Sequence, residues 1–244
     1  MIRIAILRAG VREAFPPVER ALDEPDGLLA AGGDLSPERL LDAYRHGIFP
    51  WYSDDAPILW WSPDPRTVFA TDQVPISRRL RRWLRQSDWT IDADREFRAV
   101  VRACAAPRAG HEGTWITPEM ADAYYRLHEL GHAHCVEVRR EGELVGGIYG
   151  VTCGRMFYGE SMFSRATNGS KVALIALCRA LQLWEFPLLD AQVASPHLFS
   201  MGAFEMPRRE FIARVHALTS EADASGSWRK RWPAALAHAR RLAD

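Results

Sequence analysis

Two carboxylates and one carboxamide lie within strongly apolar segments of the chain. Asp190 and Gln192 belong to a predicted strand over residues 188–193, whose two-residue period places both side chains on one face. Glu160 lies in another apolar segment, where it shares a predicted strand face with Met162. Burying an ionised carboxylate costs free energy unless it is paired or faces a site. These three residues are candidates for the polar end of a small-ligand pocket, with a satisfied structural carboxylate as the alternative.

Two tryptophans, Trp51 and Trp115, lie in irregular segments flanked by proline or glycine, where the core has less need of an indole. Aromatic rings beside a basic surface can stack on nucleic-acid bases, at about 1–3 kcal/mol per base. The same rings could instead fill an interface between two domains. The residues alone leave both interpretations open.

Arginines gather in one short segment, and no acidic residue lies between Asp72 and Asp88 to balance them. The cluster consists of Arg78, Arg79, Arg81, Arg82 and Arg85. Apolar residues recur at helical spacing over residues 76–85, and Ser77 can cap the helix. A basic helix with its own apolar anchor face predicts phosphate binding.

The total charge hides this cluster. The 244 residues include 31 basic and 31 acidic side chains, and a net charge of zero by itself disfavours a nucleic-acid partner. Nearly all the basic residues are arginines, since Lys171 and Lys230 are the only lysines. The placement of the arginines therefore predicts a local phosphate-binding surface on a neutral protein.

The segment from His128 to His132 matches the pattern His-Glu-x-x-His of zinc proteases, in which Glu129 would activate water. Metal binding requires a helix that continues through the second histidine. The helix predicted from Thr117-Pro118 should end at Gly131, so the two imidazoles would not share a helix face. We expect no metal, and a zinc metalloprotease is kept as an alternative.

The order of the elements predicts an α+β fold. Residues 1–64 are rich in Pro, Gly and Trp and contain one clear helix, from Ser36-Pro37 to Gly47, and residues 48–65 should lack regular structure. A domain boundary near 64 leaves residues 65–244 as the larger domain. There, strands over 134–140, 143–151 and 155–163 form a meander with turns at 141–142 and 153–154, followed by a helix over 171–184 and the strand 188–193. The basic tail after Ser220 receives no function.

The sequence predicts a cytoplasmic protein. No apolar run approaches the roughly 20 residues of a membrane span, and Arg3 and Arg8 interrupt the apolar start of the chain, which does not resemble a signal peptide. The four cysteines are scattered without a Cys-x-x-Cys pair, as is typical of a reduced compartment. Nothing demands more than a monomer.

Five long segments together resemble the leucyl/phenylalanyl-tRNA-protein transferase family. They are residues 26–66, 112–138, 143–151, 157–171 and 188–193. The resemblance implies a small N-terminal domain on a C-terminal GNAT-like acyltransferase domain. It implies an enzyme without a cofactor that moves Leu or Phe, and less efficiently Met, from aminoacyl-tRNA to proteins with N-terminal Arg or Lys, which marks them for N-end rule degradation. A non-catalytic RNA-binding adaptor is the rival from another class.

The resemblance also implies roles for individual residues. Trp51 and Trp115 would sandwich the terminal adenine of the tRNA, and the arginine helix would form the tRNA-binding surface. The aminoacyl pocket would be lined by Ile148, Phe157, Met162, Leu174, Leu177 and Leu189. Phe157 has the wrong strand parity for this pocket unless Gly159 marks a bulge.

Asp190, Gln192 and Glu160 match polar positions that are essential in the family. We expect Gln192, positioned by Asp190, to orient the incoming amine as it loses its proton. Glu160 would attract the cationic N-terminal residue of the acceptor. Because a glutamine is too weak a base to hold that proton, Asp190 or water would accept it.

Overall fold

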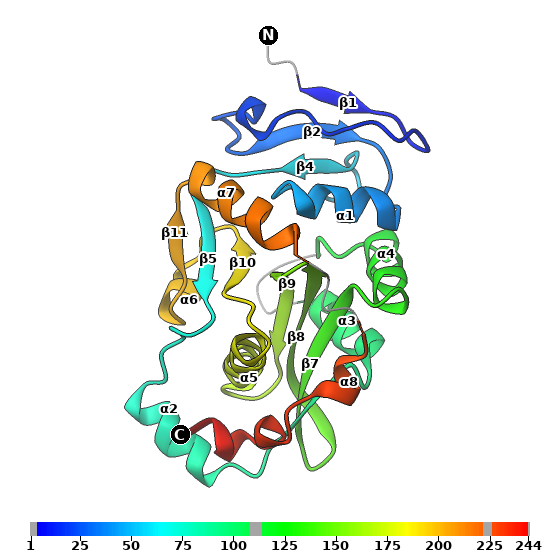
Figure 1. Ribbon diagram of the computed structural model, residues 1–244. Helices are drawn as coiled ribbons and strands as arrows, with labels where there is room; N and C mark the ends of the chain where they lie inside the picture. Colours follow the sequence, from blue (N-terminus) through cyan, green and yellow to red (C-terminus); the bar gives the residue numbers. More distant parts are fainter. Residues whose placement is uncertain (1–3, 108–113, 222–225, 244) are drawn as a thin grey trace.

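The strands of the protein form two sheets. The computed structural model describes residues 4–107, 114–221 and 226–243 (Figure 1). A four-stranded sheet has the order β1-β2-β4-β3 and a seven-stranded sheet the order β11-β5-β10-β9-β8-β7-β6. Together with the helices they make the mixed α and β architecture that the element order predicts.

The N-terminal sheet is built from short strands around one helix. Its elements are β1 (Ala5–Leu7), the 3-10 helix η1 (Val18–Arg20), β2 (Leu28–Gly32), α1 (Pro37–Arg45), β3 (Phe49–Pro50) and β4 (Leu59–Trp61). The predicted helix is confirmed, with Pro37 at its start and Gly47 at φ 70° after its end. The prediction that residues 48–65 lack regular structure is wrong, because β3 and β4 fall within them. Pro50 is compatible with β3 because β3 is an edge strand.

The larger sheet is antiparallel except for one strand pair. Its strands are β5 (Arg66–Ala70), β6 (Thr90–Ala93), β7 (Ala133–Arg140), β8 (Glu143–Cys153), β9 (Met156–Ser164), β10 (Leu188–Gln192) and β11 (Phe204–Met206). The predicted meander is confirmed as β7, β8 and β9. The second turn lies at residues 154–155, one position later than predicted, because β8 continues through Cys153. β10 is parallel to β9 and antiparallel to β5.

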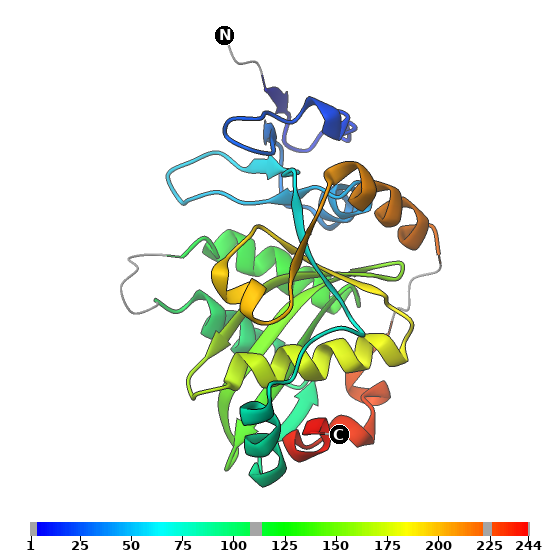
Figure 2. The ribbon, with the colours of Figure 1, turned by 90° about the vertical axis from the view of Figure 1, so that its left-hand side faces the viewer.

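Helices cover both faces of this sheet (Figures 1 and 2). α3 (Phe97–Ala105) and α4 (Pro118–Glu129) pack on one face and α5 (Gly169–Leu183) on the other. The remaining helices are α2 (Arg78–Gln86), α6 (Pro196–Ser200) and α7 (Arg208–Thr219). α3 and α4 share a core with the N-terminal sheet, whereas α5 and α2 belong to a second core. None of the helices in the described residues is long and apolar enough to cross a membrane.

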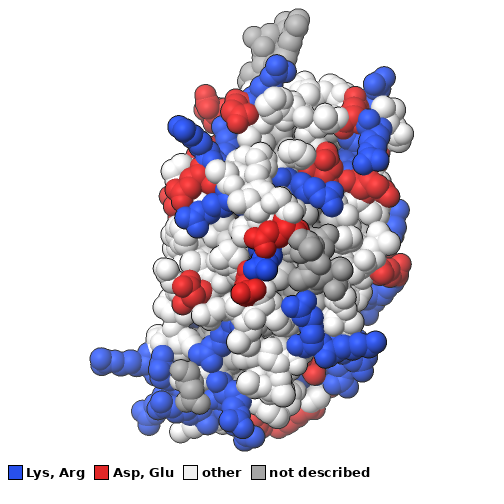
Figure 3. All heavy atoms as spheres, in the orientation of Figure 1, with Lys and Arg blue, Asp and Glu red and all other residues white. Residues whose placement is uncertain are grey.

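The C-terminal segment, for which the sequence predicted no role, packs into the second core. It consists of α8 (Trp228–Arg231), η2 (Ala234–Leu236) and η3 (Ala239–Ala243). Trp228 is fully buried, and its ring stacks on His134 at 4.3 Å between centroids. η3 lies against α2, and basic side chains gather over this part of the surface (Figure 3). The basic tail thus packs against the sheet and α2.

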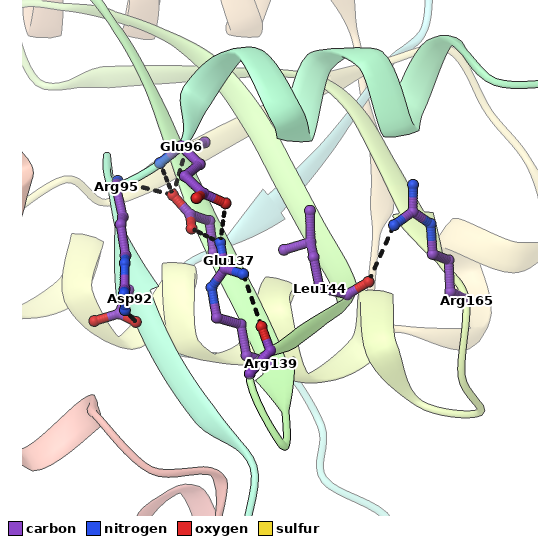
Figure 4. A network of polar contacts seen from close by, with 9 residues as sticks. Asp92, Arg95, Glu96, Glu137, Arg139, Leu144 and Arg165 are labelled. Carbon is purple, nitrogen blue, oxygen red and sulfur yellow. Dashed lines mark hydrogen bonds and ion pairs between the residues drawn. The ribbon is translucent and has the colours of Figure 1, made fainter.

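A buried carboxylate on β7 holds the start of α3 (Figure 4). Glu137 is inaccessible to solvent and accepts hydrogen bonds from the backbone N–H groups of Arg95 (2.8 Å) and Glu96 (2.6 Å). The guanidinium of Arg139 also donates to Glu137, at 2.9 Å. The Glu137 carboxylate thus caps α3 from a strand distant in sequence. No side chain at the N-cap position makes a capping hydrogen bond, so the local sequence does not predict where α3 begins.

The helix required by the zinc-protease pattern ends before the second histidine. α4 stops at Glu129, and Gly131 has the left-handed φ of 84°. Nδ1 of His128 hydrogen-bonds to the carbonyl of Ala133, and its ring stacks on Phe97 at 4.2 Å. His128 and His132 therefore do not occupy one helix face as the metalloprotease geometry requires.

Candidate active site

A cavity of about 890 Å³ opens where β9 and β10 separate. The two strands pair only over residues 156–158 and 188–190, and beyond these positions both supply lining residues. Each strand carries an irregularity at this point. β9 has one extra residue, Glu160, opposite β8, and β10 shifts register between Asp190 and Gln192. These bulges turn side chains from both strands toward the space between them.

The walls of the cavity are largely apolar. Four of the six predicted pocket residues line it: Ile148, Met162, Leu174 and Leu189. Phe69, Phe163 and Leu198 add to the same lining. An apolar cavity with a few polar groups is the usual form of a small-ligand site.

Two predicted pocket residues lie behind this wall. Phe157 and Leu177 are fully buried, and neither is among the described residues that line the cavity. The expected bulge is present, but Phe157 precedes it, where β9 is still paired with β10. The centroid of the Phe157 ring is 5.7 Å from that of Trp228. Leu177 lies almost one helical turn beyond Leu174 on α5. Both side chains belong to the apolar core that also contains the lining residues Leu174 and Leu189.

Glu160 lies at the polar end of the cavity and is held there by two buried tyrosines. Glu160 accepts hydrogen bonds from the hydroxyls of Tyr44 on α1 (2.7 Å) and Tyr124 on α4 (2.5 Å). Burial raises the pKa of Glu160 to about 7, against the lowering effect of these two hydrogen bonds. Burial also raises the pKa of both tyrosines well above the ordinary value, so they remain donors. Glu160 therefore changes its charge near neutral pH.

Gln192 lies beside Glu160 at this polar end. Its side chain lines the cavity, and its Nε2 atom is 3.5 Å from Oε1 of Glu160. The backbone of Gln192 has a φ of 59°, which is uncommon for a residue other than glycine. The backbone N–H of Gln192 donates to Oδ1 of Asp190 at 3.0 Å, a contact that holds this conformation.

Asp190 does not share the cavity face with Gln192, contrary to the predicted alternation. The bulge after Asp190 breaks the two-residue period, and Asp190 is not among the described lining residues. Its carboxylate forms a bidentate ion pair with Arg66, at 2.8 and 2.7 Å, and both side chains are inaccessible to solvent. The guanidinium also lies over the rings of Phe49 (4.6 Å) and Phe211 (4.7 Å). Asp190 is therefore a buried, paired carboxylate that positions Gln192.

The two tryptophans lie in different surroundings. Trp115 lines the cavity. Trp51 is 44% exposed, and its ring centroid is 5.8 Å from that of Trp61. Trp51 does not occur among the described lining residues. The structure thus brings Trp115 to the cavity and leaves Trp51 on the surface.

The predicted arginine helix is confirmed as α2. The hydroxyl of Ser77 accepts the backbone N–H of Leu80 at 3.2 Å, which caps the helix, and Leu80 and Leu84 are buried. All five arginines of the cluster are exposed. Within the described ranges, no acidic side chain forms an ion pair with any of them. Their charges are free to bind an external anion.

Comparison with known proteins identifies the chain. Residues 68–216 match the family model described as leucyl/phenylalanyl-tRNA protein transferase, and residues 33–64 match the model for the N-terminal domain of the same family. The chain belongs to the leucyl/phenylalanyl-tRNA-protein transferase family. The resemblance seen in the sequence is confirmed, and the protein is a transferase.

Relatives of this transferase match it over nearly their whole length. The leucyl/phenylalanyl-tRNA--protein transferase of Xanthomonas oryzae pv. oryzae strain MAFF 311018 is 59% identical over 94% of this chain and 92% of its own. That of Azoarcus sp. strain BH72 is 57% identical over 89% of this chain and 92% of its own. These matches do not favour a zinc metalloprotease or a non-catalytic adaptor.

Similarity to solved structures is weak by comparison. The structure of L-PGS from Bacillus licheniformis covers 71% of this chain and 56% of its own, with a TM-score of 0.38 and 12% sequence identity. This level of similarity does not define the fold of the transferase.

The sequence patterns do not single out three residues of this candidate site. Tyr44, Tyr124 and Arg66 hold Glu160 and Asp190 from distant elements. Tyr44 lies in the helix that the sequence predicts between Ser36-Pro37 and Gly47. Its hydroxyl is the feature from which a polar contact could have been predicted, because a buried tyrosine needs a hydrogen-bond partner.

Proposed function

We propose that this transferase moves leucine or phenylalanine, and less efficiently methionine, from aminoacyl-tRNA to the α-amino group of proteins with N-terminal Arg or Lys. The product would be marked for N-end rule degradation. One observation carries the proposal: a largely apolar cavity of about 890 Å³, which has room for an aminoacyl group, ends at the adjacent polar groups of Glu160 and Gln192. This arrangement offers an apolar wall to the donor side chain and hydrogen-bonding groups to the acceptor amine.

The chemistry is aminolysis of an ester. The acceptor ammonium loses a proton, its nitrogen attacks the ester carbonyl, and the bond from that carbonyl to the tRNA ribose oxygen breaks. The nitrogen loses a second proton after the attack, and the leaving ribose oxygen takes up one proton. One proton is therefore released to solvent for each amide formed, so protons and charge balance. Because an amide replaces an ester, the reaction needs no ATP, and positioning of the amine is the main task of the enzyme.

Glu160 and Gln192 are the residues that we expect to touch the amine. The amide oxygen of Gln192 accepts a hydrogen bond from the ammonium and orients it. The Glu160 carboxylate attracts the cationic acceptor, and with a pKa of about 7 it can accept the proton near neutral pH. Asp190, which is paired with Arg66, acts as a positioning residue. In this proposal the proton of the acceptor ammonium goes to Glu160 or to water. Asp190, which the sequence also offered as its acceptor, is paired with Arg66.

The donor is held at several places in this proposal. Ile148, Met162, Leu174 and Leu189 contact its side chain, and such a wall discriminates by only about 1–3 kcal/mol per methylene. Trp115 stacks on the terminal adenine with Trp51 on its other face. The arginines of α2 bind tRNA phosphates.

We also propose the organisation that the family implies. Residues 1–64 form the small domain and residues 65–244 a GNAT-like catalytic domain, and the change of sheet between β4 and β5 supports this division. The protein acts as a cytoplasmic monomer without a cofactor, in the compartment where aminoacyl-tRNA is made.

The direct test is transfer of label from radiolabelled leucyl-tRNA to a peptide. We expect label on a peptide that starts with Arg and none on the same peptide starting with Ala. Glu160→Ala should abolish the signal, whereas Glu19→Ala, which changes an exposed carboxylate of η1, should leave it intact. Equal labelling of the two peptides, or no labelling of the Arg peptide, would contradict the proposal.

A further inference from the structure

The C-terminal segment of the transferase carries exposed positive charge beside α2. Arg240 and Arg241 are exposed residues of η3, and within the part of the chain that the structure describes neither forms an ion pair with an acidic side chain. The space-filling view shows basic side chains collected over the region of α2 and η3 (Figure 3). This segment lies beyond residue 216, where the match to the family model ends.

Packing fixes η3 against α2. Leu80 and Leu84 of α2 are buried in the same core as Leu242 and Ala243 of η3. On the other side of η3, the guanidinium of Arg179 on α5 donates to the carbonyl of Arg241 at 3.3 Å. η3 therefore has a defined position on both α2 and α5.

Backbone contacts with the sheet hold the chain just before η3. His238 forms a β-bridge with Thr90 of the edge strand β6. The N–H of Ala239 donates to the carbonyl of Trp89, and the N–H of Ile91 donates to the carbonyl of Ala237, both at 2.9 Å. The two arginines thus project from an ordered support, so little conformational entropy of the backbone is lost when they bind.

The sign of the charge selects the partner. The proposed acceptor brings a cationic N-terminal residue, which a basic surface repels. The proposed donor is a polyanion, and the seven exposed arginines of α2 and η3, none of them ion-paired among the described residues, can neutralise several of its phosphates. Such contacts position the donor without reading its sequence.

We infer that η3 is part of the aminoacyl-tRNA-binding surface, where Arg240 and Arg241 extend the surface of α2 and contact tRNA phosphates outside the 3′ end. The inference rests on the proposed donor. The C-terminal segment then has two effects, since it both supports α2 and adds two phosphate contacts.

The test compares Arg240→Ala/Arg241→Ala with wild type at 50 and 200 mM salt. Each lost phosphate contact reduces the salt dependence of binding by about 0.7–0.9 in the logarithmic slope. The rise in KM for leucyl-tRNA over this fourfold range should therefore be about tenfold smaller in the variant, and KM at 50 mM should be several-fold higher. Arg240→Lys/Arg241→Lys keeps the charge and should restore the wild-type slope.

Two comparisons isolate the tRNA body. Phenylalanyl-adenosine keeps the ester and the adenine but lacks that body, so its KM should be the same for variant and wild type. Arg12→Ala/Arg20→Ala removes two exposed arginines from the N-terminal part of the chain and is the matched control. A salt slope in the η3 variant equal to that of this control would overturn the inference, as would an equal loss with phenylalanyl-adenosine or a raised KM for the acceptor peptide.

Direct binding separates this inference from the proposed function. Fluorescence anisotropy with uncharged tRNA needs no transfer reaction. The wild-type protein could transfer no label yet bind tRNA with a salt dependence that the η3 variant reduces. That result would contradict the proposed function and support the inferred tRNA-binding surface. If transfer occurs and the variant binds tRNA as wild type does, only the inference fails.

Discussion

Individual carboxylates in this protein differ in what they can do because their partners differ. Asp190 faces the buried guanidinium of Arg66, whereas Glu160 faces two tyrosine hydroxyls that carry no charge. The bidentate pair occupies both carboxylate oxygens of Asp190, which gives this residue a structural role. Without a paired cation, burial raises the pKa of Glu160 to about 7 and leaves it able to exchange a proton.

Replacement of Glu160 by glutamine tests this difference through pH. For wild type, kcat/KM for the acceptor peptide should rise as Glu160 ionises around pH 7. Glu160→Gln should lose that step, retain the later step due to the acceptor amine, and be about 100-fold slower at pH 8. The measurement is the pH profile of transfer, with Glu19→Gln as the control. A variant profile that still contains the step at pH 7 would assign the ionisation to another group.

The same pKa shift predicts a pH dependence of stability. The folded protein holds the proton of Glu160 up to about pH 7, whereas the unfolded chain releases it near pH 4.5. Its contribution to the free energy of unfolding should therefore fall between these values, by up to about 3 kcal/mol. Urea unfolding at pH 5 and pH 8 should show this fall in wild type, and Glu160→Gln should lack it. Parallel changes in the two proteins would exclude Glu160 as the source.

Secondary structure elements here are joined by buried polar contacts as well as by apolar packing. The start of α3 depends on Glu137 of β7, and α1 and α4 meet at Glu160 of β9. Such contacts fix the register of a helix on a sheet, because a slip of one residue would leave a buried polar group unpaired. The site depends on them, since α1 and α4 supply the tyrosines that hydrogen-bond to Glu160.

Glu137→Ala should destabilise α3 in particular. The change leaves two backbone N–H groups and the guanidinium of Arg139 without their buried acceptor, at a cost of about 3–5 kcal/mol. Urea unfolding should show the loss, and hydrogen exchange at Arg95 and Glu96 should become faster. Glu137→Gln retains one acceptor oxygen and should lose less. Wild-type exchange rates in Glu137→Ala would show that α3 is held by packing alone.

The C-terminal segment completes the second hydrophobic core of the protein. α8, η2 and η3 add buried side chains to the core formed by α2, α5 and the sheet. The anchor is Trp228, which stacks on His134 while its backbone N–H donates to Asp94 at 3.2 Å. His134 and Asp94 are themselves joined at 2.7 Å. The tail is thus part of the folded unit that carries the cavity.

Trp228→Ala should lower the stability of the entire protein. Loss of a fully buried tryptophan costs about 3–5 kcal/mol, which corresponds to a fall in Tm of about 10 °C for a chain of this size. Trp228→Phe keeps a ring against His134 and should recover much of the loss. Calorimetry provides the comparison. An unchanged Tm in Trp228→Ala would mean that the tail is an appendage.

Local signals in the sequence determined many of the elements. Ser77 and Thr117 each accept the N–H three residues on, as their positions before apolar periods predict. Gly131 ends α4, and the turn at residues 141–142 has positive φ at both positions. These features depend on neighbours within a few residues, so a linear pattern contains the information. The sequence also singled out Glu160, Gln192 and Trp115, which line the cavity.

Only the tertiary structure decided which polar groups are paired and which face the cavity. The two-residue period placed Asp190 and Gln192 on one strand face, but a bulge and Arg66, 124 residues away, separate their side chains. Distant elements also supply Tyr44, which donates a hydrogen bond to Glu160, and Trp228, which packs near the ring of Phe157. Periodicity assigns a side chain to a face of its own element. The partner across that face depends on how distant elements pack, and for a buried charge that partner determines whether it is structural or reactive.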